Sequence, residues 1–432
     1  MVMENENKPV RVLYSFPHKL GAERVCYTGW QQVRGLSEAG AEVLVFPGVL
    51  SKPLPSNVRV RQTLAIGKAR ISYNLVGHLR AAILHDYIVS KRIRALAKDI
   101  DIIHVWPTAA LKTLRAAQEL GIPTVLERPN AHTRVAYELV QAECDRLGVR
   151  LPSTQEHAFN KEILQREEEE YQLAYRLLCP SDFVAGTFLS QGFTSSKLLR
   201  HMYGFDERVY FPSDRGPEEV NGLTVLFAGV CAVRKGLHFA LQAWLRSSAH
   251  KNGTFLIAGN FVPDYREKLS GLLSHPSIRV LGLRNDIPDL MRQCNCLVLP
   301  SIEEGSPLVV AEAIGTGCVP LVSDVCTGMC RHMKNGLVHS VGDVERLADH
   351  FTMLDNNHEI LAELRSGCLR TAPEFTWTAA GRRLLEVYRE AIAAFARTKQ
   401  AQTVGSLLKN ATDSQQAPEC TSALLPTCTT DT

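Results

Sequence analysis

The sequence predicts an α/β protein with two Rossmann-like domains, each built on a parallel sheet. Short apolar runs alternate with helical patterns from residue 10 onward, and the alternation starts again at 223–228 after a break. Runs that are apolar at every position are typical of strands covered on both faces, as in a parallel sheet. The break is the polar, proline-containing run 213–221, which we expect to be the linker between the domains.

Length and composition are those of a globular protein. The 432 residues suffice for two separate cores, since 45% are hydrophobic and 22% charged. The net charge of +3 is too small to predict nucleic-acid binding, but it allows a local basic face near an anionic membrane. The first ten residues lack a signal-peptide pattern, and no apolar run approaches the roughly 18 residues of a membrane span. We expect a cytoplasmic protein, either free or at the inner face of the membrane.

The twelve cysteines do not predict a metal site. Only Cys294 with Cys296 and Cys326 with Cys330 lie close together, and neither pair has a second pair at the spacing of a zinc site. Most of the others stand inside apolar runs, so we interpret them as reduced, buried thiols. A metal or redox role for either pair is the less favoured alternative.

The first half opens with the order strand, loop, helix, strand, at 10–15, 16–21, 22–39 and 42–46. Only Gly21 precedes the helix, so the three-glycine fingerprint of dinucleotide-binding proteins is missing and an NAD enzyme is disfavoured. The alternation continues with a helix at 74–97, a strand at 101–105, a helix at 109–120, a strand at 123–126, a helix at 161–176, and a strand and helix within 177–192.

The segment ERPNAHT, residues 127–133, follows the strand 123–126 at its carboxyl end, where α/β proteins place their chemistry. His132 can donate or accept a hydrogen bond there, and Arg128 is a second candidate for contact with a phosphate or an acceptor. The alternative for His132 is a loop histidine that caps the helix after it.

In the second half, the loop 229–236 joins the strand 223–228 to the helix 237–245 and carries Arg234 and Lys235 side by side. Two cations in a loop between strand and helix suit a diphosphate, whose negative charge increases as it leaves. The alternative is a pair of solvated surface cations. The elements that follow are strands at 254–259 and 277–282 and helices at 286–293, 343–354, 358–370 and 375–395.

The most informative stretch is 297–323, which reads as strand, loop, short helix, strand. Ser306 is a favoured N-cap residue and Pro307 suits the first helical position, so we predict a helix from Pro307 to Gly315. Its first amides, those of Leu308 and Val309, would face the carboxyl end of the preceding strand and receive a phosphate.

Glu312 is the single ionisable residue of this otherwise apolar helix. A buried carboxylate costs several kcal/mol unless hydrogen bonds compensate it. A ribose diol could donate two hydrogen bonds to Glu312, while Glu304, eight positions earlier, would lie over the same crevice. The alternatives are a buried arginine as the partner of Glu312 and a solvated Glu304.

The spacing of Glu304, seven residues and Glu312, within PSIEEGSPLVVAEAIGTGCVPLVSD, resembles the signature of retaining, nucleotide-sugar-dependent glycosyltransferases of family 4, glycosyl transferases group 1. The resemblance implies the GT-B fold, in which two Rossmann-like domains face a cleft and a C-terminal helix crosses back to the first. The implied division is an acceptor-side domain at 1–205, a nucleotide-sugar-binding domain at 206–374, the crossing helix at 375–397 and a disordered tail at 398–432.

The resemblance also implies roles for individual residues. Lys235 and Arg234 would stabilise the departing diphosphate, and Glu304 and His132 would orient the sugar. Donor-binding residues would be Glu312, Gly229, Gly259, Ser306, Leu308, Val309 and Gly21. The implied reaction moves a sugar from a nucleotide diphospho-sugar to a saccharide, lipid or small-molecule acceptor with retention at the anomeric carbon. No metal, cofactor or nucleic acid is expected.

Three places depart from the family pattern: Leu20 and Val230 replace expected residues, and 326–331 lacks an expected glutamate. These departures keep a non-catalytic sugar-nucleotide-binding subunit open as an alternative, besides a nucleotide-sugar epimerase or a phosphorylase on the same fold. The transferase hypothesis makes a geometric prediction. Arg234 and Lys235 should share one cavity with Glu312.

Overall fold

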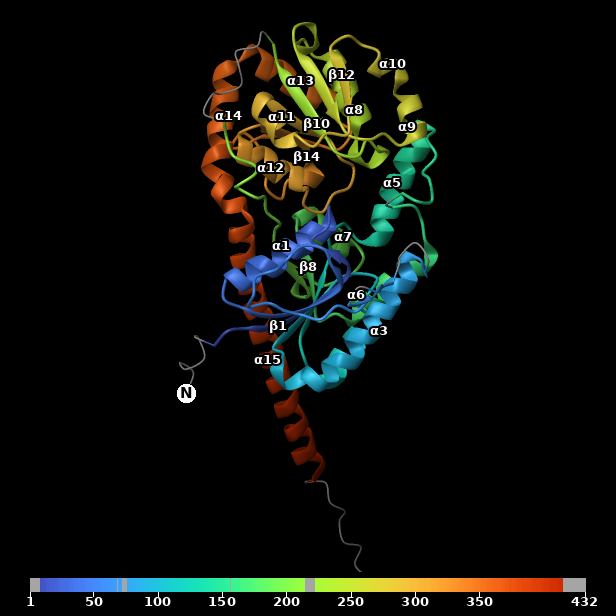
Figure 1. Cartoon of the computed structure of the whole chain (residues 1–432), viewed down its shortest axis with the longest axis vertical. Helices are drawn as coiled ribbons and strands as arrows, with labels where there is room; N and C mark the ends of the chain where they lie inside the picture. The colour runs from blue at the N-terminus through green and yellow to red at the C-terminus, as the bar shows by residue number, and fades with distance from the viewer. Residues whose placement is uncertain (1–7, 68, 72–75, 156, 214–221, 415–432) are drawn as a thin grey trace, which may run out of the picture.

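The computed structural model describes residues 8–67, 69–71, 76–155, 157–213 and 222–414, which form two lobes stacked along the long axis (Figure 1). Most of the predicted linker therefore lies outside the described residues. The first lobe holds a seven-stranded parallel sheet in the order β3-β2-β1-β6-β7-β8-β9. Its strands are β1 (Arg11–Leu20), β2 (Glu42–Leu50), β3 (Arg59–Val60), β6 (Ile102–Val105), β7 (Thr124–Glu127), β8 (Arg176–Cys179) and β9 (Leu198–Arg200).

The helices of the first half are α1 (Val25–Glu38), α3 (His78–Leu96), α4 (Leu111–Leu120), α5 (Thr133–Leu147), α6 (Lys161–Leu173) and α7 (Asp182–Ser190). A small antiparallel pair, β4 (Ala65–Ile66) and β5 (Ala69–Arg70), precedes α3. No helix of the described residues is long and apolar enough to cross a bilayer.

The second lobe holds a six-stranded parallel sheet in the order β12-β11-β10-β13-β14-β15. Its strands are β10 (Thr224–Ala228), β11 (Thr254–Ala258), β12 (Ile278–Gly282), β13 (Cys296–Leu299), β14 (Val319–Ser323) and β15 (Leu337–His339). Its helices are α8 (Leu237–Arg246), α9 (Pro263–Lys268), α10 (Ser270–Leu273), α11 (Ile287–Gln293), α12 (Leu308–Thr316), α13 (Val344–Asn356) and α14 (His358–Thr371). The predicted fold class is confirmed, because both halves contain a parallel sheet covered by helices.

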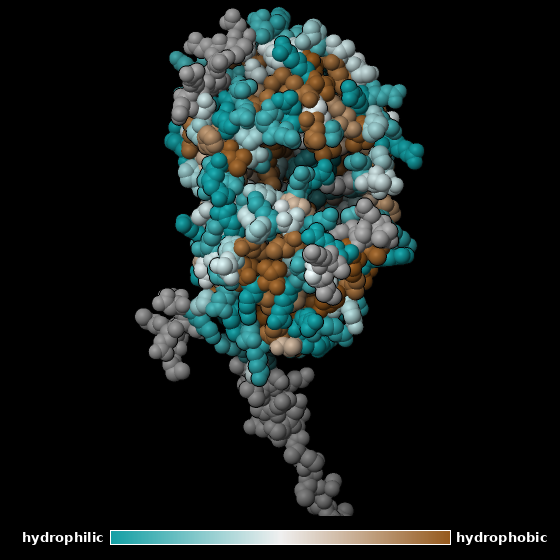
Figure 2. Space-filling view, in the orientation of Figure 1, coloured by the Kyte–Doolittle hydropathy of each residue, from teal (hydrophilic) through white to brown (hydrophobic). Residues whose placement is uncertain are grey.

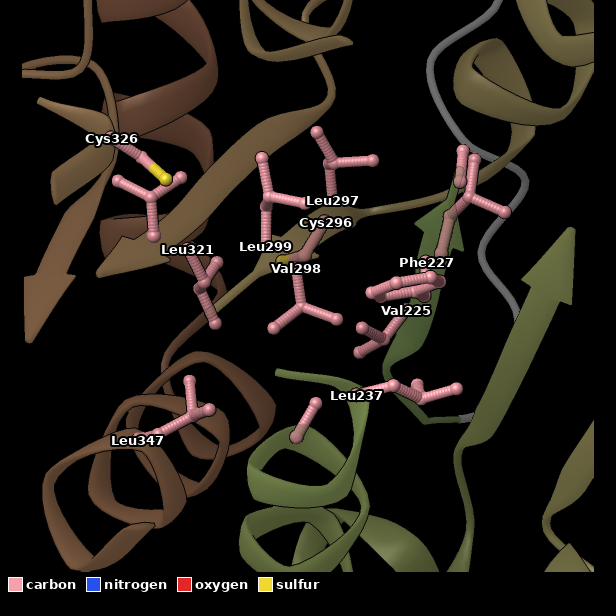
Figure 3. Close-up of a cluster of buried hydrophobic side chains, with 14 of the residues drawn as sticks. Val225, Phe227, Leu237, Cys296, Leu297, Val298, Leu299, Leu321, Cys326 and Leu347 are labelled. Atoms are coloured by element: carbon pink, nitrogen blue, oxygen red, sulfur yellow. The ribbon is translucent and has the colours of Figure 1, made fainter. Parts of the chain in front are cut away.

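The core of the second lobe explains why runs of consecutive apolar residues predicted its strands correctly. All four residues of β13 are buried, because one face of the strand packs on helices and the other is covered as well. In Figure 3, Val225 of β10 and Val298 of β13 project toward the helices that carry Leu237 and Leu347.

The long helix α15 (Trp377–Ser414) returns to the first lobe, as predicted. Leu384, Val387 and Tyr388 are buried in the core of that lobe, in the cluster that contains Val33 and Leu36 of α1. Figure 1 shows α15 (red) running from the second lobe down the length of the first. The helix continues to Ser414, so it is longer than predicted and occupies part of the expected disordered tail; residues 415–432 lie outside the described part.

Helix α5 departs from the predicted division. It belongs to the first half of the sequence, but Val140, Cys144 and Leu147 are buried in the core cluster of the second lobe. Figure 1 shows α5 (teal) beside α9 of the second lobe. A boundary at residue 205 therefore describes the order of the chain but not its packing, because 133–147 reach across from one lobe to the other.

Candidate active site

Glycines bring the loops of the second lobe close together. A Cβ on Gly259 would lie 1.7 Å from the carbonyl oxygen of Gly229, and a Cβ on Gly236 would lie 1.9 Å from that of Pro300. Both distances are shorter than any real Cβ contact, so these positions require glycine. The loop 229–236 is thereby packed against the loop that follows β13, which carries the predicted acids.

Lys235, Arg234 and Glu304 form an ion cluster at this contact. The ammonium group of Lys235 is paired with the carboxylate of Glu304, and Arg234 Nη1 lies 3.4 Å from Glu304 Oε1. Burial raises the pKa of Glu304, but the charges of Lys235 and Arg234 outweigh it and hold the pKa below its usual value. The structure thus joins three of the four predicted catalytic residues, and neither the cations nor Glu304 is merely solvated.

Glu303 is a fourth member of this cluster that the sequence interpretation missed. Arg234 Nη1 donates to its carbonyl oxygen at 2.9 Å and lies 3.3 Å from its Oε2. His157 Nε2 lies 2.6 Å from Oε2, and the backbone N–H of Ala131 donates to Oε1 at 2.8 Å. Burial would raise the pKa of Glu303, but His157, Arg234 and the Ala131 amide lower it to about 2. The available signal was the pair of adjacent acids in SIEEGS, of which the family spacing uses only the second.

The start of α12 differs from the prediction by one residue. The helix begins at Leu308, and Pro307, whose backbone is extended, takes the N-cap position. Ser306 is therefore not the N-cap; its hydroxyl is buried without a hydrogen-bond partner among the described residues. The helix ends at Thr316, with Gly317 in the left-handed conformation, and not at Gly315, where a Cβ would meet the Phe205 ring.

A cavity of about 500 Å³ lies between the lobes, and its walls include Gly21, Leu308 and Glu312. Figure 2 shows the molecule hollowed between its two lobes. The remaining lining residues come from the start of α1, from the segment before the linker and from α15: Ala22, Glu23, Arg24, Tyr27, Gly204, Asp206, Val209, Tyr210 and Trp377. Three of the predicted donor-binding residues are thus brought together, from both lobes.

Glu312 faces this cavity and interacts with the hydroxyl of Tyr210 by a hydrogen bond. Burial raises the pKa of Glu312 to about 7, although the Tyr210 hydroxyl acts in the opposite direction. The protein partner of Glu312 is therefore a tyrosine, and not the arginine of the alternative hypothesis.

The prediction of one shared cavity is not met by this structure. Among the described residues that line the cavity, none belongs to the loop 229–236, and Gly259, Ser306, Val309 and Glu304 are absent as well. The physical reason is that the lobes touch beside the ion cluster. A Cβ on Gly305 would lie 1.6 Å from the carbonyl oxygen of Pro129, so the loops pack closely together there.

His132 takes the N-cap position of α5 and does not line the cavity. Its ring is buried at the start of α5, where Nδ1 accepts a hydrogen bond of 3.3 Å from the backbone N–H of Arg134. The rings of Tyr171 and Phe188 each lie 5.0 Å from it, centroid to centroid, and burial lowers its pKa to about 4. This is the capping alternative, and the sugar contact of His132 stays a prediction.

Arg128, the second candidate from this segment, is buried as well and pairs with Glu167 at 3.2 Å. In this structure Arg128 therefore forms a buried ion pair inside the first lobe. Within the described part of the chain, no group of three histidine, cysteine, aspartate or glutamate side chains could hold a metal ion.

Comparison with known protein families finds a match in the second lobe. Residues 222–357 match the family model described as glycosyl transferases group 1. A Campylobacter jejuni relative, N,N'-diacetylbacillosaminyl-diphospho-undecaprenol alpha-1,3-N-acetylgalactosaminyltransferase, is 28% identical over 123 residues, which cover 28% of this chain and 32% of the relative. D-inositol 3-phosphate glycosyltransferase of Thermobispora bispora is 31% identical over 116 residues, which cover 26% of this chain and 27% of the relative. The chain matches a third or less of the length of these relatives.

Solved structures extend the likeness to most of the chain. HepE of Anabaena in complex with UDP has a TM-score of 0.63 and 15% sequence identity, covering 88% of this chain and 100% of HepE. Sucrose-phosphate synthase of Thermosynechococcus elongatus has a TM-score of 0.64 and 16% identity, covering 90% and 100%. The chain therefore has the GT-B fold, and the stretch 222–357 of its second lobe is similar to the family glycosyl transferases group 1.

Proposed function

We propose that the protein transfers a sugar from a nucleotide diphospho-sugar to an acceptor, with retention at the anomeric carbon. The observation that carries this proposal is the pair of acids at the family spacing. Glu304 stands in an ion cluster with Lys235 and Arg234, and Glu312 faces the interlobe cavity. The names of the curated relatives agree with transfer of a sugar.

In the proposed reaction, the bond between the anomeric carbon and the diphosphate breaks, and negative charge accumulates on the leaving phosphate. Lys235 and Arg234 stabilise that charge by exchanging their contacts with Glu304 for contacts with the phosphate. The first amides of α12, those of Leu308 and Val309, add donors at the positive end of the helix. These charges belong to the chain itself, so the proposed reaction is metal-independent.

Glu312 holds the ribose in this proposal, since a vicinal diol can donate to both of its oxygens. Gly21, from the first lobe, lines the same cavity. The ion cluster does not line this cavity in the present structure, so the donor itself must join the two.

The test is incubation of the purified protein with UDP-glucose, GDP-mannose and ADP-glucose, with release of the nucleoside diphosphate as the measurement. We expect slow hydrolysis of one of them, its loss in a Lys235→Ala variant, and no loss in Lys251→Ala, which changes an exposed lysine. Proton NMR of the anomeric product reports retention or inversion. Absence of both binding and release with all three donors would refute the transferase hypothesis.

For the acceptor we propose a saccharide carried by a lipid. The Campylobacter relative is named for a diphospho-undecaprenol-linked acceptor, and a 35% identical Escherichia coli relative, matched over 68 residues, is named for an acceptor of the same kind. The Thermobispora relative is named for D-inositol 3-phosphate, so a small phosphorylated acceptor is the alternative. An assay that offers both classes of acceptor to the same enzyme distinguishes them.

We also propose peripheral contact with an anionic membrane through the outer face of α3, at the cytoplasmic side. Figure 1 shows this helix (light blue) along the side of the first lobe. Its exposed residues are mainly basic or apolar: Arg80, Leu84, Tyr87, Lys91, Arg92 and Arg94. Such a face suits anionic headgroups and the interface below them. Sedimentation with phosphatidylglycerol vesicles, but not with pure phosphatidylcholine vesicles, is expected, and Lys91→Glu should weaken it.

A second candidate is a sugar-nucleotide-binding subunit without turnover. The observation that favours it is that both cations of the cluster are already paired with acids, while Val230 stands where the family often has a further basic residue. Binding of a nucleoside diphosphate without any release of product from the three donors would support this candidate.

A further inference from the structure

Glu303 joins three separate segments through one buried carboxylate. Ala131 lies in the loop after β7, His157 in the segment between α5 and α6, and Arg234 in the cation loop of the second lobe. The first two partners precede the linker, and the third follows it. Glu303 therefore keeps all its partners only while the lobes touch.

The cost of separating these partners is large because the carboxylate is fully buried. A buried acid that loses a charged partner or an N–H donor keeps an unsatisfied charge, which is more costly than the bond itself was worth. The neighbouring residue, Gly305, packs against the carbonyl of Pro129 and so lies at the same contact between the lobes. The position of Glu303 is thus determined by closure of the lobes.

Arg234 is held through the same residue. Its Nη1 contacts both the carbonyl oxygen and the carboxylate of Glu303. A guanidinium is planar and rigid, so fixing one of its nitrogens on a buried residue also fixes the direction of the whole plane. His157 and the Ala131 amide also interact with the carboxylate of Glu303, so Arg234 is not the sole partner of that negative charge. Glu303 can therefore hold Arg234 without pairing with it exclusively.

We propose that Glu303 is a positioning residue of the transfer reaction, which fixes Arg234 beside the donor diphosphate when the lobes are closed. The inference rests on the proposed function. It assigns to Glu303 and His157 the task of coupling lobe closure to stabilisation of the leaving group. In this way the cation takes its place only when the site is closed.

The test uses Glu303→Gln in the full-length protein, because glutamine retains the size and the acceptor for the Ala131 amide but removes the charge. We expect turnover of the donor to fall about 10- to 100-fold, the effect of losing a hydrogen bond to a charged group. Binding of the nucleoside diphosphate should not weaken, because the substitution removes a negative charge near the phosphates. A merely structural role would impair both turnover and binding.

Two comparisons make the result specific. In an Arg234→Ala background, Glu303→Gln should cost little further turnover, because the residue it positions is already absent. The matched control is Glu143→Gln, which breaks the other histidine–carboxylate contact between the same parts of the chain, 2.9 Å from His238 Nε2 and away from the cations. We expect this control to retain the turnover of the wild type.

Equal losses in Glu143→Gln and Glu303→Gln, or unchanged turnover in Glu303→Gln, would overturn the inference while leaving the proposed function intact. Failure of the wild type to bind UDP, GDP or ADP would overturn both. If Glu303→Gln does not fold, as judged by thermal unfolding, His157→Gln replaces it. That variant should show a smaller fall in turnover than Glu303→Gln, with unchanged nucleotide affinity.

Discussion

Nucleotide binding should depend on the ionisation of Glu312. Burial raises the pKa of this carboxyl to about 7, and only its ionised form accepts hydrogen bonds at both oxygens from a ribose diol. Between pH 6 and pH 8 the ionised fraction rises from about one tenth to about nine tenths. The affinity for a nucleoside diphosphate should therefore increase about tenfold over this range, which corresponds to about 1.4 kcal/mol.

The same shift predicts the pH dependence of stability, with the opposite sign. The folded protein holds the proton of Glu312 more tightly than the unfolded chain, whose carboxyl titrates near 4.5. The resulting stabilisation is fully present below about pH 4.5 and is lost as the pH rises through about 7, at a total of ~3 kcal/mol. A bound ribose would offset this loss, because it favours the ionised form.

Isothermal titration calorimetry with UDP, GDP and ADP at pH 6 and pH 8 measures the effect on binding. The terminal phosphate of the nucleotide titrates in the same range, with a pKa of about 6, so the comparison is made with Glu312→Gln. This variant keeps the titration of the ligand and removes that of the protein. The reasoning is refuted if both proteins show the same change of affinity with pH. Tyr210→Phe should move the rise to higher pH, because it removes the group that lowers the pKa.

Three further predictions concern the ion cluster and the contact between the lobes. Lys235→Ala should reduce turnover at least 100-fold in a protein that still folds, since the cation acts on the leaving group and Arg234 still pairs with Glu304; a retained turnover would contradict that role. Gly305→Ala should also abolish turnover, because its Cβ would lie 1.6 Å from the Pro129 carbonyl and prevent closure, whereas Gly271→Ala, with open space around it, should be active. Leu147→Ala should lower the free energy of unfolding in urea by about 2–4 kcal/mol, because it leaves a cavity between α5 and the second lobe; no change would show that α5 does not contribute there.

The fold was predictable because the relevant information is local. Strands such as β6 and β13 are four buried residues in succession, and a parallel sheet is what buries both faces of a strand. The two ends of α12 were each wrong by one residue; at the start, an extended Pro307 can serve as the N-cap itself. The pattern of Glu304 and Glu312 was equally local, since Glu304 lies in the loop after β13 and Glu312 in the helix that follows it.

What could not be predicted depends on contacts between distant segments. Glu303 lies 146 residues from His157 in the sequence, and no spacing rule connects the two. The apolar stripe of α5 predicts that one face is buried, but it does not say against which lobe. His132 has the same chemistry as a helix cap and as a sugar ligand, so only its neighbours, Tyr171 and Phe188, distinguish the two roles.

The return of α15 to the first lobe has a consequence for how the protein is made. Leu384, Val387 and Tyr388 complete a core whose other side chains, such as Val33, were synthesised some 350 residues earlier. While the chain emerges from the ribosome, the apolar face of α1 therefore remains exposed until the whole second lobe has been synthesised. Domains usually fold one after another during synthesis, but here the lobe that emerges first is the last to be finished.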